Sequence, residues 1–211
     1  MIHTVVGSFD SAVDAVNVAR KLRLARFLDS DVNIVVNNTQ RVSAGAQHPV
    51  QTATDSNAVA EGALAGGALG GVAGLAASLM GLAIPGIGPI LAAGPIVAAL
   101  AGAGAGAVAG GLISGLAELD IPESEAQNYA EAVRRGAALV TVCADSTRAH
   151  EARAIMRDQG AFDIKNRVEQ WRGTGWEGYD PAAGPFTYDE IESERLRSRA
   201  AQRSAEWELR R

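Results

Sequence analysis

Residues 62–117 read GALAGGALGGVAGLAASLMGLAIPGIGPILAAGPIVAALAGAGAGAVAGGLISGLA, and none of these 56 residues carries a charged side chain. Small residues recur in this stretch at every fourth position, in two series: Gly62, Gly66, Gly70, Gly74 and Ser78, then Gly102, Gly106, Gly110 and Ser114. Residues four apart share one face of a helix, so each series forms a stripe where another backbone can approach closely. The pattern predicts two helices, 62–84 and 95–117, that pack through these small residues.

The two stripes match when the chain is folded back on itself about Gly88. Small residues then face small residues at every level of an antiparallel helical hairpin. The turn between them, IPGIGPI, contains Pro85 and Pro89, which a regular helix does not accommodate. Each helix is about 34 Å long at ~1.5 Å per residue, close to the thickness of the hydrocarbon core of a bilayer.

Two environments for this glycine-zipper hairpin follow from its composition. The length and the absence of charge favour insertion into the cytoplasmic membrane, with both termini in the cytoplasm. Alanine and glycine gain little free energy on transfer into lipid, which leaves a cytoplasmic alternative. In that alternative the hairpins of a soluble homo-oligomer bury one another at the centre of the assembly.

The flanking sequences predict a second, globular unit. Short apolar runs predict strands and segments with helical caps predict helices. The strands are expected at 2–9, 32–36, 138–144 and 162–168, and the helices at 12–27, 122–135 and 147–159. Gly136 suits the left-handed position that follows a helix.

The order of these elements is β-α-β, insertion, α, β-α-β, which predicts an α+β fold of the ferredoxin-like type. In that sandwich the first and third strands are central, as the apolar runs TVVGSF and ALVTVCA suggest. The expected organisation is a first half-domain, a polar linker, the helical hairpin, a second half-domain and a tail. Their boundaries are 1–38, 39–57, 58–119, 120–168 and 169–211.

The tail combines three aromatic residues with a charged helix. Trp171, Trp176 and Tyr179 lie between glycines, an arrangement that anchors a tail on its own domain or on a neighbour. Thr187 and Glu190 have the spacing of a capping box for a helix from about 188 to 209. That helix is either a solvated charged helix or a docking element for a partner.

No constellation of residues in the sequence indicates catalysis, a cofactor or a metal. The three histidines, His3, His48 and His150, lie far apart, and Cys143 has no histidine near it in sequence. A formal net charge of −5 and a pI near 5.2 argue against nucleic-acid binding, which needs a basic surface. We therefore expect a non-enzymatic protein.

Several segments resemble bacterial heat-induced stress proteins of the YflT type, also described as general stress protein-like domains. They are TVVGSFDSAVDAV, the glycine-rich stretch, IPESEAQNYAEAVRRGAALVTVCAD and WRGTGWEGYDPAAGPFTYDEIESER. The resemblance implies a small domain interrupted by a glycine zipper and expression linked to stress. It implies no activity and no functional residues.

The expected function is therefore that of a stress-associated protein that self-associates through its glycine-zipper hairpin, inserted in the membrane. A soluble homo-oligomeric scaffold is one alternative. An accessory subunit of a larger membrane complex, docked through the aromatic tail and charged helix, is another. The residues expected to carry helix packing are the glycines of the two stripes and Ser114.

Overall fold

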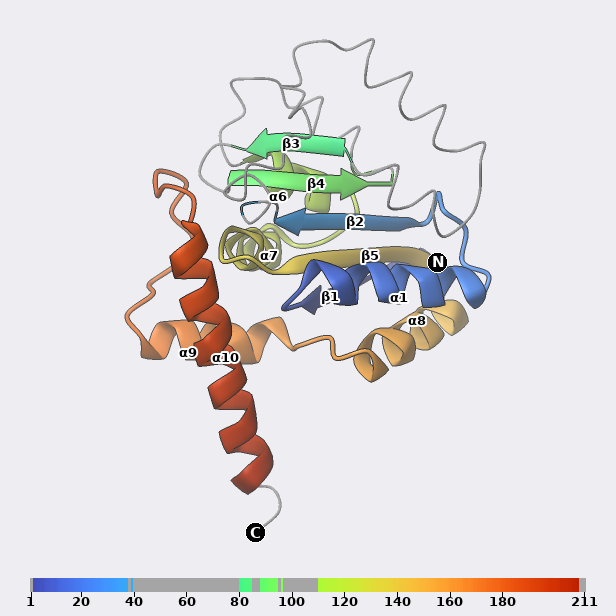
Figure 1. Ribbon diagram of the computed structural model, residues 1–211. Helices are drawn as coiled ribbons and strands as arrows, with labels where there is room; N and C mark the ends of the chain where they lie inside the picture. Colours follow the sequence, from blue (N-terminus) through green and yellow to red (C-terminus); the bar gives the residue numbers. More distant parts are fainter. Residues whose placement is uncertain are drawn as a thin grey trace.

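The computed structural model describes residues 2–37, 39, 80–84, 88–94, 96 and 110–208, and it confirms the predicted α+β class (Figure 1). A five-stranded antiparallel sheet has the order β1-β5-β2-β4-β3. The strands are β1 (Ile2–Phe9), β2 (Val32–Asn37), β3 (Met80–Ile84), β4 (Gly88–Ala93) and β5 (Ala138–Asp145). The described helices are α1 (Ala12–Leu24), α6 (Gly110–Ala117), α7 (Glu123–Arg134), α8 (Ser146–Asp158), α9 (Ile164–Gly173) and α10 (Tyr188–Glu208).

Strand β5 lies between β1 and β2. Val142 of β5 is opposite Val5 of β1 on one side and Val32 of β2 on the other. All three side chains are buried, as expected of β-branched residues in strands that are covered on both faces. The first and third predicted strands are thus neighbours, but only the third has full strands on both sides.

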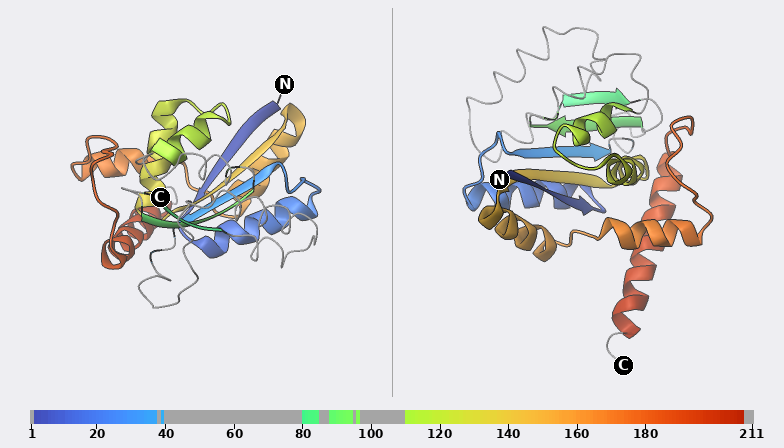
Figure 2. Two further views of the ribbon diagram at one scale, coloured as in Figure 1. Left: turned by 90° about the horizontal axis from the view of Figure 1, so that it is seen from above. Right: turned by 180° about the vertical axis from the view of Figure 1, so that it is seen from behind.

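Alternating side chains divide the core into two layers, one on each face of the sheet. Helices α1 and α8 cover one face through Val18, Leu22 and Met156, which pack with Ile34 and Val140. On the other face, α6, α7 and α9 pack over the side chains of intervening positions, such as Val35 and Leu139. Figure 2 shows α6 and α7 on the side of the sheet opposite to α1.

The predicted fourth strand, 162–168, is wrong. Of these residues only Phe162 pairs with a strand, through a single bridge to Ser8, and the chain then enters α9. Asp163 caps this helix by accepting a hydrogen bond from the backbone N–H of Lys165. The buried positions Ile164, Val168 and Trp171 follow the helical spacing, so the short apolar run belonged to a helix and not to a strand.

The predicted helical hairpin is wrong at its tip. Residues 80–84 and 88–93, expected to be helix and turn, form the antiparallel strands β3 and β4. Ile84 pairs with Gly88 and Met80 with Ala92, so the pairing is centred two residues before the predicted fold point at Gly88. Within the described ranges, no helix is both long enough and apolar enough to cross a membrane.

The described end of the insertion is part of the domain core. Helix α6 packs on α7 through Leu112 and Leu116, both fully buried. Asn33 of β2 holds the chain that follows β4. Its Oδ1 accepts a hydrogen bond from the backbone N–H of Ile96 at 2.7 Å, and its Nδ2 donates one to Thr141 Oγ1 at 3.0 Å. Gly94, with φ +93°, passes so close to β2 that a Cβ there would overlap the carbonyl oxygen of Val32.

Candidate functional site: a buried charge cluster under the C-terminal helix

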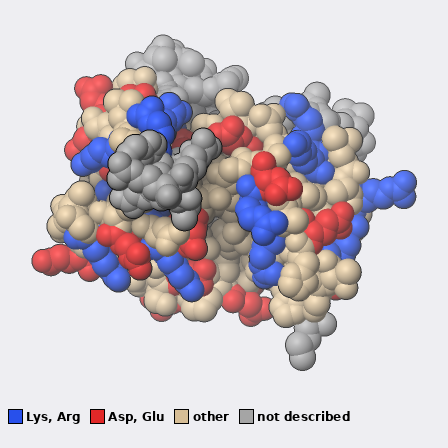
Figure 3. All heavy atoms as spheres, turned by 90° about the horizontal axis from the view of Figure 1, so that it is seen from below, with Lys and Arg blue, Asp and Glu red and all other residues tan. Residues whose placement is uncertain are grey.

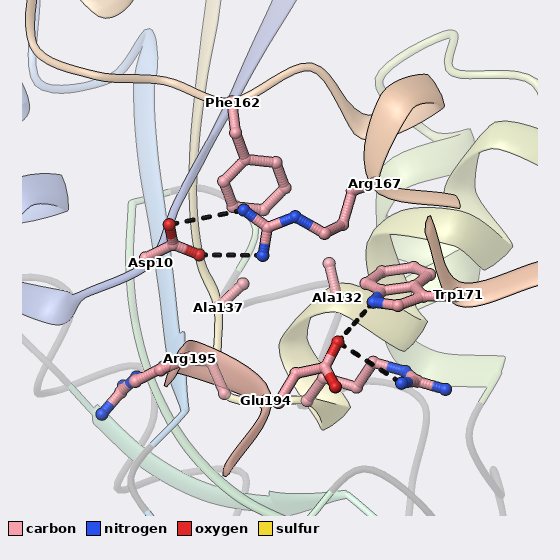
Figure 4. A pocket seen from close by; sticks show the side chains of 10 residues that line it. Asp10, Ala132, Ala137, Phe162, Arg167, Trp171, Glu194 and Arg195 are labelled. Carbon is pink, nitrogen blue, oxygen red and sulfur yellow. Dashed lines mark hydrogen bonds and ion pairs between the residues drawn. The ribbon is translucent and has the colours of Figure 1, made fainter. Parts of the chain in front are cut away.

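The most unusual concentration of polar side chains lies where α10 crosses α7 and α9. Four charged residues are almost fully buried there: Glu131 and Arg134 on α7, Arg167 on α9 and Glu194 on α10. Isolated buried charges are costly, so each must find a partner. We call these residues, with Asp10, Arg135, Trp171, Arg195 and Ser198, the α10 cluster; Figure 4 shows the part of it around Asp10, Arg167, Trp171, Glu194 and Arg195.

Glu131 is the centre of one half of the α10 cluster, and its side chain is 0% exposed. Arg134 donates to both carboxylate oxygens, from Nε and from Nη2, each at 2.8 Å. Arg135, one turn further along from Glu131, donates from Nε to Oε1 at 2.5 Å. These spacings of three and four residues put all three side chains on one face of α7, directed toward α10.

Glu194 brings α10 into this network. Its Oε1 accepts a 2.6 Å hydrogen bond from the indole N–H of Trp171 and lies 3.5 Å from Nη1 of Arg135. Its other oxygen, Oε2, lies 3.0 Å from Nη2 of Arg197. The guanidinium of Arg135 also lies 4.7 Å from the centre of the Trp171 ring, a cation–π geometry.

Arg167 holds the second half of the α10 cluster. It donates to Asp10 Oδ1 at 3.0 Å and to Oδ2 at 3.3 Å, and to Ser198 Oγ at 2.7 Å. Its guanidinium lies 3.9 Å from the centre of the Phe162 ring. One side chain thus links the end of β1, helix α9 and helix α10, as Figure 4 shows for Asp10 and Phe162.

The backbone of α7 completes the seat of α10. Gly136 has φ +94°, the left-handed conformation predicted for it, and Ile191 of α10 fills the space beside it. Arg195 donates from Nη2 to the carbonyl of Gly136 at 3.2 Å. The predicted capping box starts α10: Glu190 N–H donates to Thr187 Oγ1, and Thr187 N–H donates to the Glu190 carboxylate.

The ion pairs and hydrogen bonds of the α10 cluster are suited to holding α10 on the domain. The cavity among its residues has about 10 Å³, enough for one water molecule. The Glu131, Glu194 and Asp10 carboxylates are all engaged by arginines, so none is free to act as a general base. The described contacts of the cluster therefore hold α10 on α7 and α9.

The aromatic residues predicted to anchor the tail lie against this chain's own domain. Trp171 is buried, and Trp176 packs on it edge-to-face with ring centres 5.5 Å apart. Tyr179 is partly buried, and that burial raises the pKa of its hydroxyl. The chain after Tyr179 also contacts α7. Arg134 donates to the carbonyl of Gly184 at 3.0 Å, and its guanidinium lies over the ring of Phe186.

The predicted helix-packing residues fall mostly outside the described residues. These are Gly62, Gly66, Gly70, Gly74, Gly102 and Gly106. Gly110 is the first residue of α6, and the side chain of Ser114 is exposed. The face by which α6 packs on α7 carries Leu112 and Leu116 instead.

The sequence interpretation missed Glu131, Arg134, Arg167 and Glu194. A signal for Arg167 existed, because it lies between Ile164, Val168 and Trp171 on a helical period. For Glu131 and Glu194 no local signal exists, because charged residues on a helix are usually solvated. In the described part of the chain, no group of three or more His, Cys, Asp or Glu side chains could hold a metal ion.

In comparisons with known proteins, no protein-family model, no curated protein and no solved structure matches the chain.

Proposed function

We propose that this is a non-enzymatic protein that self-associates through the glycine- and alanine-rich insertion at 58–119. The observation that carries the proposal is the position of β3, which is the last strand at its edge of the sheet among the described residues and whose sequence MGLAI contains no charge and no proline. Edge strands expose unpaired N–H and C=O groups, and proteins that stay monomeric protect such edges with charges or prolines. An uncharged edge favours pairing with a second copy.

A soluble homo-oligomer is the form of this proposal that the geometry favours. The tip of the predicted hairpin belongs to β3 and β4, and its last turns belong to α6, which is buried on α7. Between Ile96 and Gly110 lie 13 residues, and these extend only about 20 Å as a helix. This length is shorter than the roughly 30 Å hydrocarbon core of a bilayer.

Membrane insertion is the second candidate, supported by the 56 uncharged residues and the four-residue glycine period. In this form 62–79 and 97–109 pack together and contact lipid, as part of this protein's own assembly or of a larger membrane complex. Retention of the protein in membranes washed with alkaline carbonate supports this candidate. Complete release into the wash excludes it.

We also propose that β1, β5 and β2, with α1 and α8, form a ferredoxin-like core whose fourth strand is reduced to the bridge between Ser8 and Phe162. The order of these three strands and the position of both helices on one face support this relation. An experimental structure with α1 and α8 on opposite faces of the sheet excludes it.

The molar mass of the full chain without detergent, measured by sedimentation equilibrium, tests self-association. We expect a homo-oligomer whose association weakens in Leu82→Lys, because a lysine on β3 places a charge at the edge. Leu24→Lys is the matched control, since Leu24 is 76% exposed and lies on α1, which packs with β1, β5 and β2. A monomeric wild type contradicts the proposal, and so does equal association of both variants. The expression change under heat, implied by the resemblance, is tested separately by transcript measurement.

A further inference from the structure

The opposite edge of the sheet carries a groove that the proposed self-association does not use. It has a volume of about 380 Å³, and its walls come from β1, α7, α8, the segment between α8 and α9, and the first residues of α9. Its lining includes Val6, Ser8, Glu125, Arg153, Phe162 and Lys165.

The groove lies in the plane of the sheet, beside β1. Its two helical walls belong to opposite faces, because α7 packs with Val35 and Leu139 and α8 packs with Ile34 and Val140. A space between two such helices, next to an outermost strand, is the place of a further strand. Figure 3 views the molecule from this side and shows a hollow bordered by Lys and Arg side chains, with Asp and Glu among them.

The backbone of β1 is open toward the groove. Ser8 accepts a 2.9 Å hydrogen bond from the N–H of Phe162, so the main-chain groups of Ser8 point away from β5. In an antiparallel strand the direction alternates, so the N–H and C=O groups of Val6, which lines the groove, and of Thr4, further along the same edge, also point away from β5. Among the described residues, only Phe162 pairs with this edge.

One buried side chain in the groove also lacks a partner. Ser8 is 2% exposed, and its hydroxyl forms no hydrogen bond with any described residue. A buried hydroxyl is normally hydrogen-bonded, so an unpaired one marks a place where a ligand can supply the partner. The carbonyl of an added backbone is a suitable acceptor.

The charges at the groove favour an acidic occupant. Arg153 and Lys165 are exposed at its walls and form no ion pair with a described residue. The two carboxylates of the lining are already engaged: Asp163 caps α9, and Glu125 accepts from the Tyr129 hydroxyl at 2.9 Å. These neutral donors leave both carboxylates negatively charged, but Arg157 also belongs to the lining, so three cations stand against two carboxylates and the net charge of the groove is positive.

From this geometry we propose that the groove beside β1 binds an extended acidic peptide, which pairs with Thr4 and Val6 as an added strand. Main-chain hydrogen bonds supply the affinity and alternate side chains supply the selectivity in this mode of recognition. Acidic side chains of the peptide lie near Arg153 and Lys165, and apolar ones pack on Met156, Phe162 and Ile164.

The test uses the full chain and three fluorescein-labelled octapeptides, followed by fluorescence anisotropy. The first alternates glutamate and valine, the second replaces glutamate by lysine, and the third is the first with every second backbone nitrogen methylated. We expect saturable binding of the first peptide only. Methylation keeps the charge and the side chains but removes the N–H groups that pair with a strand.

Variants of the chain locate the binding in the groove. Val6→Pro removes one outward N–H at an edge, where proline is tolerated, and Arg153→Glu with Lys165→Glu reverses the wall charges. We expect each to weaken binding of the first peptide about tenfold or more. Lys21→Glu, an exposed change on α1, is the matched control and leaves binding unchanged.

Three results overturn the proposal: no binding of the glutamate–valine peptide by the wild-type chain, equal binding of the methylated peptide, or equal binding by the charge-reversed variant. The methylated peptide keeps the test decisive even if Val6→Pro does not fold. Neither β3 nor any other described residue of the insertion lines this groove, so failure here leaves the proposed self-association standing, and the reverse also holds.

Discussion

The side chain of Ile191 fills the space beside Gly136, so a Cβ on Gly136 would overlap Cγ2 of Ile191. Gly136 ends α7 in the left-handed conformation, and Ile191, 1% exposed, is the apolar residue that seats α10 on this turn. The attachment of the C-terminal helix therefore depends on the absence of one methyl group. Beyond its seat, the C-terminal half of α10 extends away from the rest of the molecule (Figures 1 and 2).

Gly136→Ala is expected to destabilise the fold by about 3 kcal/mol or more, through backbone strain together with displacement of Ile191. Gly160→Ala is the matched control, because Gly160 has φ +84° but no atom within 4 Å of an added Cβ. Strain alone costs that variant about 1 to 2 kcal/mol. Urea unfolding gives both values, and faster trypsin cleavage after the arginines of α10 reports its release. Equal losses in the two variants contradict the shared-space argument.

Glu131→Gln is expected to cost about 3 kcal/mol, because it leaves Arg134 and Arg135 without the carboxylate that neutralises them. The residue is fully buried, so water cannot substitute for the lost charge. Glu123→Gln, at an exposed position in the first turn of the same helix, should change stability by about 0.5 kcal/mol or less. Both are measured by chemical unfolding at neutral pH. A loss below that of the control would show that the α10 cluster is solvated.

Arg167→Lys is expected to destabilise the fold by about 1 to 3 kcal/mol, although the charge is retained. A lysine has a single nitrogen and cannot reach both oxygens of Asp10 and the hydroxyl of Ser198 in the fork geometry of arginine. Arg172→Lys, exposed on the same helix, is the control. Thermal unfolding separates the two variants, and an unchanged midpoint for Arg167→Lys would reject the bridging role.

Asn33→Ala is expected to cost about 2 kcal/mol, since it leaves the N–H of Ile96 and the hydroxyl of Thr141 buried without their partner. The loss should appear as faster amide hydrogen exchange at Ile96 and in β4 before it appears in β1. Asn33 is thus expected to hold the chain just after β4 against β2. Uniform acceleration across the sheet would instead indicate a general loss of packing.

The capping box makes stability depend on pH in a defined direction. Hydrogen bonds from the backbone and side chain of Thr187 lower the pKa of Glu190 from 4.5. A carboxyl group whose pKa is lower in the folded than in the unfolded state stabilises the fold at any pH above the unfolded-state pKa. That stabilisation is lost as the pH falls through the folded-state pKa. The difference in free energy of unfolding between wild type and Glu190→Gln should therefore be largest near about pH 7 and vanish near about pH 2. A difference that grows on acidification has the wrong sign.

Local patterns were sufficient for much of the fold. The strands β1, β2 and β5, the helices α1, α7, α8 and α10, and the left-handed Gly136 were all predicted within a few residues of their bounds. Strand or helix periodicity and terminal capping are encoded in residues close together in sequence. The capping box of Thr187 and Glu190, three residues apart, is such a case.

Only the tertiary structure decided the state of residues 80–93 and of α9. An uncharged segment of glycine, alanine and leucine has little preference of its own, and β3 and β4 exist because β4 pairs with β2, far away in sequence. The four-residue period of small residues in 62–114 therefore did not determine the structure at the tip of the insertion. The α10 cluster follows the same reasoning: whether Glu194 is solvated or buried depends on Trp171 and Arg135, which only folding brings to it.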